Sequence, residues 1–339
     1  MPLITATSDI SVELQGHYDR NLLENAQVIL LFDKFGQVRP IPKNVGERIN
    51  FRRYGKLPIN TTPLTEGVTP TGQKLAATDI YATVRQYGDF ITLTDWLMLT
   101  GLDPNLLDIG ENLLADQMAE TVDTLHRNAL VAGTTIRYAN GESARASVAT
   151  AINDDDIDSI IRTMESNKAK KIGKLKTGGR GVNTSPIRPA YIAVTHTDSR
   201  RDIEALTGFI GVEEYASQDA LSMQAGEIVE IGAVKNIRFL STTNAKIWGH
   251  GGAAVGATGL KSDDSTNIDV YATLIFGENA YGTIPLQEGT IKNIVKQMGS
   301  GGTEDPLNQR ATTGWKAATT TKILNEDFII RLEHGVTDL

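Results

Sequence analysis

The sequence has no cysteine among its 339 residues. Disulfides, thiolate nucleophiles, zinc–thiolate centres and iron–sulfur clusters are therefore excluded. No apolar run approaches the roughly 20 residues of a membrane-spanning helix. The N-terminus also lacks a basic segment followed by an apolar one, so we predict neither a membrane span nor a secretory signal. A chain of this kind is held together by packing and hydrogen bonds, within itself or between copies of itself.

An excess of basic residues is also missing. The chain has 33 Lys and Arg against 41 Asp and Glu, which gives a formal net charge of -8. This balance argues against a protein whose main role is to grip nucleic acid. The length is enough for one large domain or two ordinary ones, and the 40% of hydrophobic residues is far from a disordered composition. A compact globule of this size would expose about 13,500 Å², and an extended subunit should expose more.

Patterns for catalysis, cofactors and metals are weak. The glycines of 249–256 follow a predicted strand, but no helix N-terminus comes next to hold a dinucleotide. Residues 259–262 lack the glycine before lysine that a phosphate-binding loop needs. The pairs Glu213–Glu214 and Asp263–Asp264 are expected to be solvated charges. None of the histidines has metal-ligand spacing, so we expect surface or interface side chains at His17, His126, His196, His250 and His334.

The first part of the chain predicts two extended features. Residues 1–18 have no periodicity and indicate an arm, followed by an amphipathic helix over 19–32 that needs a partner surface. Alternating patterns at 48–52 and 79–85 predict two strands. The stretch of 55–78 between them is rich in Pro, Gly and Thr, which favours a projecting two-stranded ribbon. A flexible surface loop is the alternative.

The strongest helix is predicted over 104–132, with Asp103 as N-cap and Pro104 at its first position. It would be about 43 Å long, so another element must lie along it. Its apolar stripe is expected to face the C-terminal strands that carry Phe328, Ile330 and Leu332. That stripe consists of Leu106, Leu113, Leu114, Met118, Val122 and Leu125.

The remaining chain reads as a small α/β segment followed by returning strands. Three aspartates at 154–156 predict a helix N-terminus. Residues 174–189 are basic and Gly-rich and indicate a linker between domains. The basic stretch Lys168–Arg180 is expected to be a solvated loop or a subunit contact. Further predictions are a short helix near 201–206, a loop over 249–267, and strands over 190–195, 228–248, 291–297, 315–324 and 328–333.

This order of elements, together with several local patterns, resembles the major capsid proteins of tailed double-stranded DNA bacteriophages. The run GEIVEIGAVKNIR at 226–238 is similar to a strand–Gly–strand element of that family. YIAVTHTD at 191–198 is similar to the strand and helix that precede it. The C-terminal patterns GWKA, ILNE and IRLE resemble the closing hairpin of podophage-type members. The fold is shared with the floor of herpesvirus capsids.

The resemblance implies an α+β fold with a set order of parts. These are an N-terminal arm over 1–46, an extended β-ribbon loop over 47–94, a peripheral domain over 95–185 with a spine helix at 104–132, an axial domain over 186–290, and C-terminal strands of the peripheral domain over 291–339. The arm begins at Met1 with no scaffolding segment before it. That departure from many relatives implies a separate scaffolding protein or none.

The implied function is structural. Copies of the chain would assemble into hexamers and pentamers of an icosahedral shell that encloses the genome, without enzymatic activity, cofactor or membrane. Implied partners are other copies, scaffolding, portal and decoration proteins, and packaged DNA held non-specifically at the inner wall. The protein would reside in the virion after assembly in the host cytoplasm. Two alternatives stay open: the shell of an encapsulin-type nanocompartment, and a soluble enzyme with an unrecognised site.

Intersubunit contacts are expected on the arm and on the ribbon. We predict that Arg52, Arg53 and Lys56 meet acidic groups of a neighbouring subunit. Apolar contacts to a neighbour are predicted for Leu22, Leu23 and Phe32 in the arm region. Both sets follow from the view that neither element can cover its own surface within one chain.

Overall fold

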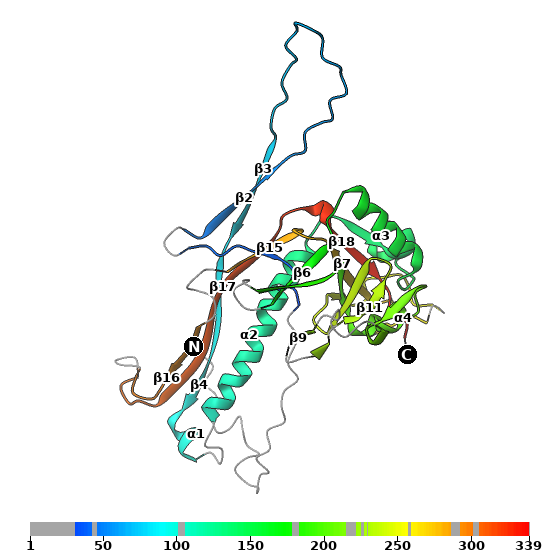
Figure 1. Ribbon diagram of the computed structural model, residues 1–339. Coiled ribbons are helices and arrows are strands. Elements are labelled where there is room, and N and C mark those ends of the chain that lie inside the picture. Colours follow the sequence, from blue (N-terminus) through cyan, green and yellow to red (C-terminus); the bar gives the residue numbers. More distant parts are fainter. Residues whose placement is uncertain are drawn as a thin grey trace.

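The computed structural model describes residues 31–42, 46–100, 106–177, 183–214, 222–224, 227–228, 230–256, 259–285, 292–300 and 305–338. The chain exposes 20113 Å² of surface, well above the roughly 13,500 Å² of a compact globule. The extended shape predicted from the sequence is therefore confirmed. Figure 1 shows its most obvious cause, a ribbon that projects from the body.

A nine-stranded sheet forms the centre of the rounded lobe in Figure 1. Its middle strands have nearly unbroken apolar sequences because both faces of the sheet are covered. β12 pairs with β7 in parallel, and β14 pairs with β18 and β7 antiparallel. The strands are β5 (Ile136–Tyr138), β6 (Ile172–Thr177), β7 (Asn183–His196), β8 (Phe209–Gly211), β11 (Glu230–Val234), β12 (Ile237–Thr242), β13 (Ile247–Trp248), β14 (Val270–Phe276) and β18 (Ile329–His334).

Two helices cover one face of this sheet. α3 (Asp154–Ser166) begins at the three aspartates as predicted, with Asn153 as its N-cap. Its buried side chains join Ile203 of α4 (Arg200–Glu204) in one core cluster. A second cluster combines Leu31 and Phe32 with Leu130 and with the sheet residues Ile192 and Leu274. The N-terminal segment therefore completes the core of a sheet that lies far from it in sequence.

A five-stranded sheet forms the elongated part of the molecule. Its central strand is β17 (Arg310–Ile323), which pairs with β4 (Arg85–Thr94) on one side and with β15 (Tyr281–Pro285) and β16 (Lys292–Lys296) on the other. The short β1 (Gln37–Val38) adds to β15. Helix α2 (Leu106–Val131) runs along this sheet (Figure 1) and confirms the predicted long helix from 106 onward. Asp103 and Pro104 lie outside the described residues.

The predicted partner of the long helix is wrong. Leu114 of α2 is buried against Trp315 and Ala317 of β17, not against the last strand. Ile330 and Leu332 of β18 belong to the nine-stranded sheet, where they pack in the cluster that contains α3. Leu113, also expected in the interface, is 45% exposed. The helix therefore lies on β17 and β4, and the two C-terminal strands separate into different sheets.

Further expectations meet different outcomes. The ribbon is confirmed as an antiparallel pair of β2 (Arg48–Tyr54) and β3 (Ala77–Thr83). The linker expected over 174–189 is wrong, since β6 and β7 form a hairpin there and β7 continues into the sheet. The arm over 1–18 and nearly all of the helix expected over 19–32 lie outside the described residues. Short elements complete the set: α1 (Asp95–Thr100), β9 (Ser222–Gln224) and β10 (Glu227–Ile228). No described helix is long and apolar enough to cross a membrane.

Candidate interaction surfaces

The ribbon has a packed foot and an uncovered tip. At the foot, Ala82 and Val84 are buried with Ile284 and Ala318 of the five-stranded sheet. Beyond it, every residue of 55–76 is exposed. Five large apolar side chains on this tip are between 47% and 85% exposed: Leu57, Ile59, Leu64, Val68 and Leu75. Apolar side chains gathered on an exposed segment are typical of an interaction site.

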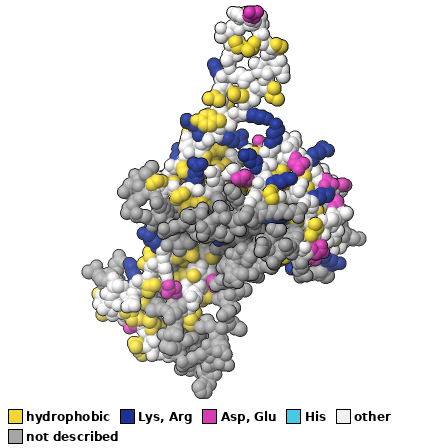
Figure 2. All heavy atoms as spheres, in the orientation of Figure 1, with side chains coloured by type: hydrophobic (Ala, Val, Ile, Leu, Met, Phe, Trp, Pro, Cys, Tyr) yellow, Lys and Arg dark blue, Asp and Glu magenta, His cyan; other side chains and the backbone are white. Residues whose placement is uncertain are grey.

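Cations gather around the foot of the ribbon, as Figure 2 shows. Arg52 is held within the chain, because its Nε and Nη2 donate to the carboxylate of Asp79 at 2.8 and 3.1 Å. Arg53 donates to the side chain of Asn325 in the turn before β18. The neighbouring Lys168 lowers the pKa of Lys56. Two ammonium groups that repel each other favour an anionic partner.

The predicted contact residues of the arm have two outcomes. Leu22 and Leu23 lie outside the described residues. The intersubunit contact predicted for Phe32 is wrong, because this side chain is 1% exposed and belongs to the chain's own core. Its carbonyl accepts a hydrogen bond from the hydroxyl of Tyr281 at 2.9 Å. A side chain this deeply covered has no surface left for a neighbour. The contacts expected of Arg52, Arg53 and Lys56 stay predictions.

A cavity of about 610 Å³ opens on the five-stranded sheet between β4, β17 and β16. Trp315 points to α2, since its Nε1 donates to Gln117 at 3.1 Å, and alternation turns its neighbour Gly314 to the opposite face. Gly314 lies between Phe90 and Ile294 in register. These two side chains are 57% and 44% exposed. The result is a groove, named here the β4–β16 groove, with Phe90 and Ile294 on either side of a glycine floor and with Lys296 and Lys316 also in its lining.

Glycine is required at this floor. A Cβ on Gly314 would lie 2.6 Å from the Cβ of Phe90 and 2.8 Å from the carbonyl oxygen of Asp89. One on Gly88, also in the groove, would lie 2.6 Å from the carbonyl oxygen of Trp315. All three separations are shorter than real contacts, so side chains there would push β4 away from β17. The two glycines therefore let the strands approach and leave the groove open.

A buried carboxylate fixes the N-terminal segment to α2. Asp123 is 1% exposed, and its Oδ1 accepts from the backbone N–H groups of Leu31 and Phe32, both at 3.2 Å. Its Oδ2 accepts from the amide of Asn244 at 2.9 Å. Burial raises the pKa of Asp123 to about 6, although these hydrogen bonds and the nearby Arg127 oppose the shift. Three distant parts of the chain meet at this one side chain.

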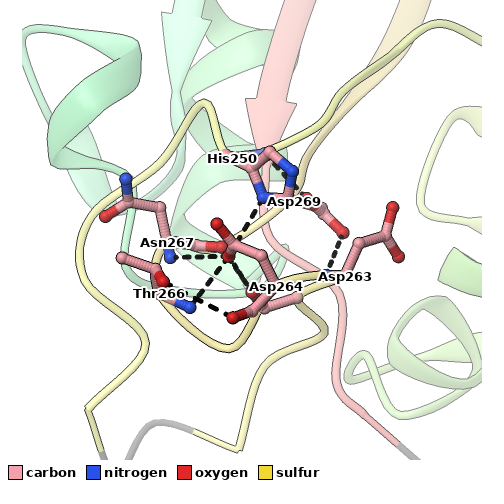
Figure 3. Close-up of polar contacts among 7 residues, drawn as sticks. His250, Asp263, Asp264, Thr266, Asn267 and Asp269 are labelled. Carbon is pink, nitrogen blue, oxygen red and sulfur yellow. Dashed lines mark hydrogen bonds and ion pairs between the residues drawn. The ribbon is translucent and has the colours of Figure 1, made fainter.

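The Gly-rich loop after β13 is held by its own polar groups (Figure 3). The Asp264 carboxylate accepts from the backbone N–H groups of Thr266 and Asn267 at 2.8 and 3.3 Å. That of Asp269 accepts from the N–H groups of His250 and Asp263 at 2.8 and 3.0 Å. No helix follows the glycines in this part of the described chain, as the sequence predicts.

The described histidines do not come together as metal ligands. Two of them, His126 and His334, are buried at 2% and 0% exposure, so the expectation of surface or interface positions is wrong for them. His196 lies beside Asp198, and His250 beside Asp264. Within the described ranges, no three or more His, Asp or Glu side chains come together as metal ligands. His17 lies outside those ranges.

A buried ion pair between two neighbouring strands was not predicted. Arg238 on β12 is 2% exposed, and its Nε and Nη2 donate to the carboxylate of Glu230 on β11, both at 2.6 Å. Each charge interrupts an otherwise apolar strand sequence. A lone charge in each of two neighbouring apolar strands is the signal that could have identified it. Removing one partner would leave a buried charge without its counterion.

Comparison with known proteins gives one consistent result. A family model described as phage capsid protein matches residues 77–332. The major capsid protein of Pseudomonas phage KPP21 is 23% identical over 326 residues, which cover 83% of this chain and 81% of that protein.

Solved structures agree in fold. The capsid of Ralstonia phage GP4 matches with a TM-score of 0.63 at 12% identity, over 100% of this chain and 99% of that one. The capsid of Cyanophage Pam1 matches with a TM-score of 0.60 at 14% identity, over 99% of both chains. At such low identity, these structures bear on the fold alone.

Proposed function

The chain belongs to the phage capsid protein family, and we propose that it is the major capsid protein of a tailed double-stranded DNA phage. Its copies would form the hexamers and pentamers of an icosahedral shell around the genome. The observation that carries this proposal is the projecting ribbon, whose large apolar side chains have no cover within their own chain. A monomer gains nothing from such an element, whereas a shell subunit can use it to hold a neighbour.

The β4–β16 groove of a neighbouring subunit is the proposed seat of the ribbon tip. The tip is extended and carries exposed large apolar side chains, and the groove offers it the apolar side chains of Phe90 and Ile294 over a glycine floor. An isolated two-stranded hairpin is marginal in water, and its free strand edges invite uncontrolled pairing. Both problems are relieved when the ribbon lies across a neighbour. Contacts along the ribbon and the arm together would reach about the 1,600 Å² of a standard interface.

The cations at the foot of the ribbon would set the register of this contact. Arg53 and Lys56 are proposed to face acidic groups on the neighbour, and Lys168 extends the same basic surface. Arg52 contributes less because Asp79 already neutralises it. Exposed charge pairs add specificity and association rate more than affinity.

The remaining partners follow from the same role. We propose contacts with a separate scaffolding protein, a portal and decoration proteins, assembly in the host cytoplasm, and residence in the virion. Packaged DNA would touch the inner wall without sequence preference. A net charge of -8 limits its adhesion to phosphate, so DNA can move during packaging. We propose that the chain has a structural role and no enzymatic activity.

Deletion of residues 57–77 tests the proposed role of the ribbon. We expect a soluble, folded subunit that fails to form stable shells, because the deleted segment is exposed and contributes nothing to the described cores. Circular dichroism would report folding, and sedimentation with electron microscopy would report assembly.

A double variant, Thr61→Ala with Thr71→Ala, is the matched control. It changes the same exposed tip but keeps every large apolar side chain, so it should assemble like the wild type. Normal, pressure-resistant particles formed by the deletion variant would remove the ribbon from the mechanism.

A further inference from the structure

The end of the ribbon presents one carboxylate. Glu66 is the one acidic residue in the exposed stretch of 55–76 and lies midway along it. The backbone N–H of Val68 donates to the carbonyl of Thr65 at 3.1 Å, and Gly67 has a φ of 75°, as the third position of a type II turn requires. Glu66 is therefore a corner residue of the turn that ends the ribbon, where Figure 2 shows acidic side-chain atoms.

Three lysines share the groove face of the five-stranded sheet. Lys292 on β16 lies directly opposite Lys316 on β17, and Lys296 follows on the same face of β16 because residues four positions apart in a strand point the same way. All three are exposed, and Lys296 and Lys316 line the β4–β16 groove. Like charges directly opposite each other on neighbouring strands repel. An anion placed beside them would therefore be stabilised.

The described part of the chain offers these lysines no counterion. None of the ion pairs among the described residues includes one of them. Asp89 is the one acidic residue in the lining of the groove, but its Oδ2 accepts from Gln117 of α2 at 2.8 Å. Glu111 of α2 is held by Asn293, whose side chain alternates to the face opposite the lysines. The negative charge near this strand pair is thus engaged on the helix side.

We propose that Glu66 of one subunit enters the β4–β16 groove of a neighbouring subunit and pairs there with Lys296 and Lys316. Lys292 adds to the positive potential at the same place. This inference rests on the proposed function and deepens it, because it names the residues that select the seat of the ribbon tip. Exposed charge pairs contribute specificity and association rate more than affinity. The pair would therefore choose the groove and fix the depth of insertion.

The apolar residues on both sides fit this arrangement. Leu64 and Val68 flank the turn residue and are 76% and 63% exposed. In the groove, Phe90 and Ile294 lie among the lysines and are 57% and 44% exposed. An acidic residue between apolar ones would thus meet apolar residues between basic ones. Burial of these apolar side chains supplies the affinity that the charge pair does not.

A charge exchange tests the pairing, with shell yield measured by sedimentation and electron microscopy at low ionic strength, where exposed charges are least screened. Glu66→Lys should lower the yield at least about tenfold, because the tip would then meet lysines of its own sign. Lys296→Glu combined with Lys316→Glu should do the same, because Glu66 would then meet carboxylates. The triple variant restores opposite charges and should recover a yield near that of the wild type.

Glu278→Lys is the matched control. It makes the same charge change at an exposed carboxylate in the turn between β14 and β15, outside the tip and the groove, and should assemble like the wild type. Glu66→Gln gives a second reading that does not depend on how the lysine variants fold, since circular dichroism should find this exposed exchange harmless. Its assembly should be less sensitive to added salt than that of the wild type.

The outcomes separate this inference from the function on which it rests. Normal shells from Glu66→Lys, or a salt dependence unchanged in Glu66→Gln, would overturn the pairing and leave the proposed function standing. A folded triple variant that does not recover would overturn the pairing with these lysines. A wild type that forms no shells would overturn the proposed function and the pairing together.

Discussion

Asp123 connects the N-terminal segment, helix α2 and the turn at Asn244 through one buried carboxylate. The pKa of this group rises from 3.8 to about 6, chiefly because of burial. Its protonated form is therefore favoured in the folded chain over the unfolded one. The stability that this group contributes is complete below pH 3.8 and is lost as the pH rises through about 6.

We therefore expect a shift in stability between pH 7 and pH 5. On this change the free energy of unfolding of the wild type should rise by about 1 kcal/mol relative to Asp123→Asn. Urea unfolding of the unassembled subunit at several pH values measures both curves. The difference between them isolates this carboxyl from the other titrating groups. Parallel pH profiles for the two proteins would contradict the assigned role.

The sequence did not reveal this residue, for a reason specific to the helix. Leu114, Met118 and Val122 recur every four residues and produce the apolar stripe that faces the five-stranded sheet. Asp123 falls outside this stripe, on a face that looks solvated in the sequence. That face is buried too, because the N-terminal segment and the other sheet cover it. Polar residues on a helix face indicate an exposed face only when no distant segment of the chain packs against it.

Among the elements, helix α2 was predictable because its apolar residues recur at the three- and four-residue spacing of a helix, which the local sequence alone shows. Its partner strand was not, since β17 and β18 are both mixed apolar strands and only long-range pairing assigns them to different sheets. The prediction of a linker over 174–189 was wrong for a related reason, because it overlooked strand pairing. Lysines and glycines there suggest a loop, but β6 and β7 gain their backbone hydrogen bonds from each other. Backbone pairing of this kind leaves little trace in composition.

Leu114→Ala tests the packing of this helix. Leu114 is 5% exposed against Trp315 and Ala317, so the substitution should lower the free energy of unfolding by about 2 to 5 kcal/mol. Leu113→Ala is the control one position away, at a side chain 45% exposed, and should change stability by about 0.5 kcal/mol or less. Chemical denaturation of the unassembled subunits measures both. Equal effects of the two substitutions would mean that the helix faces are assigned wrongly.

The whole molecule combines a rounded lobe, an elongated sheet and a free ribbon (Figure 1). Its order of ribbon, long helix and returning strands could be predicted from the sequence because each part has its own composition. The β4–β16 groove, which we propose as the seat of the ribbon tip, could not, since it joins residues more than 200 positions apart.

The mass and contents of the particle formed by the purified chain test the central claim most directly. We expect electron microscopy and sedimentation to find closed icosahedral shells of megadalton mass, with DNA inside the native particles. Shells that enclose protein cargo instead of DNA would favour a nanocompartment. A small, stable oligomer with no tendency to close into shells would contradict the account.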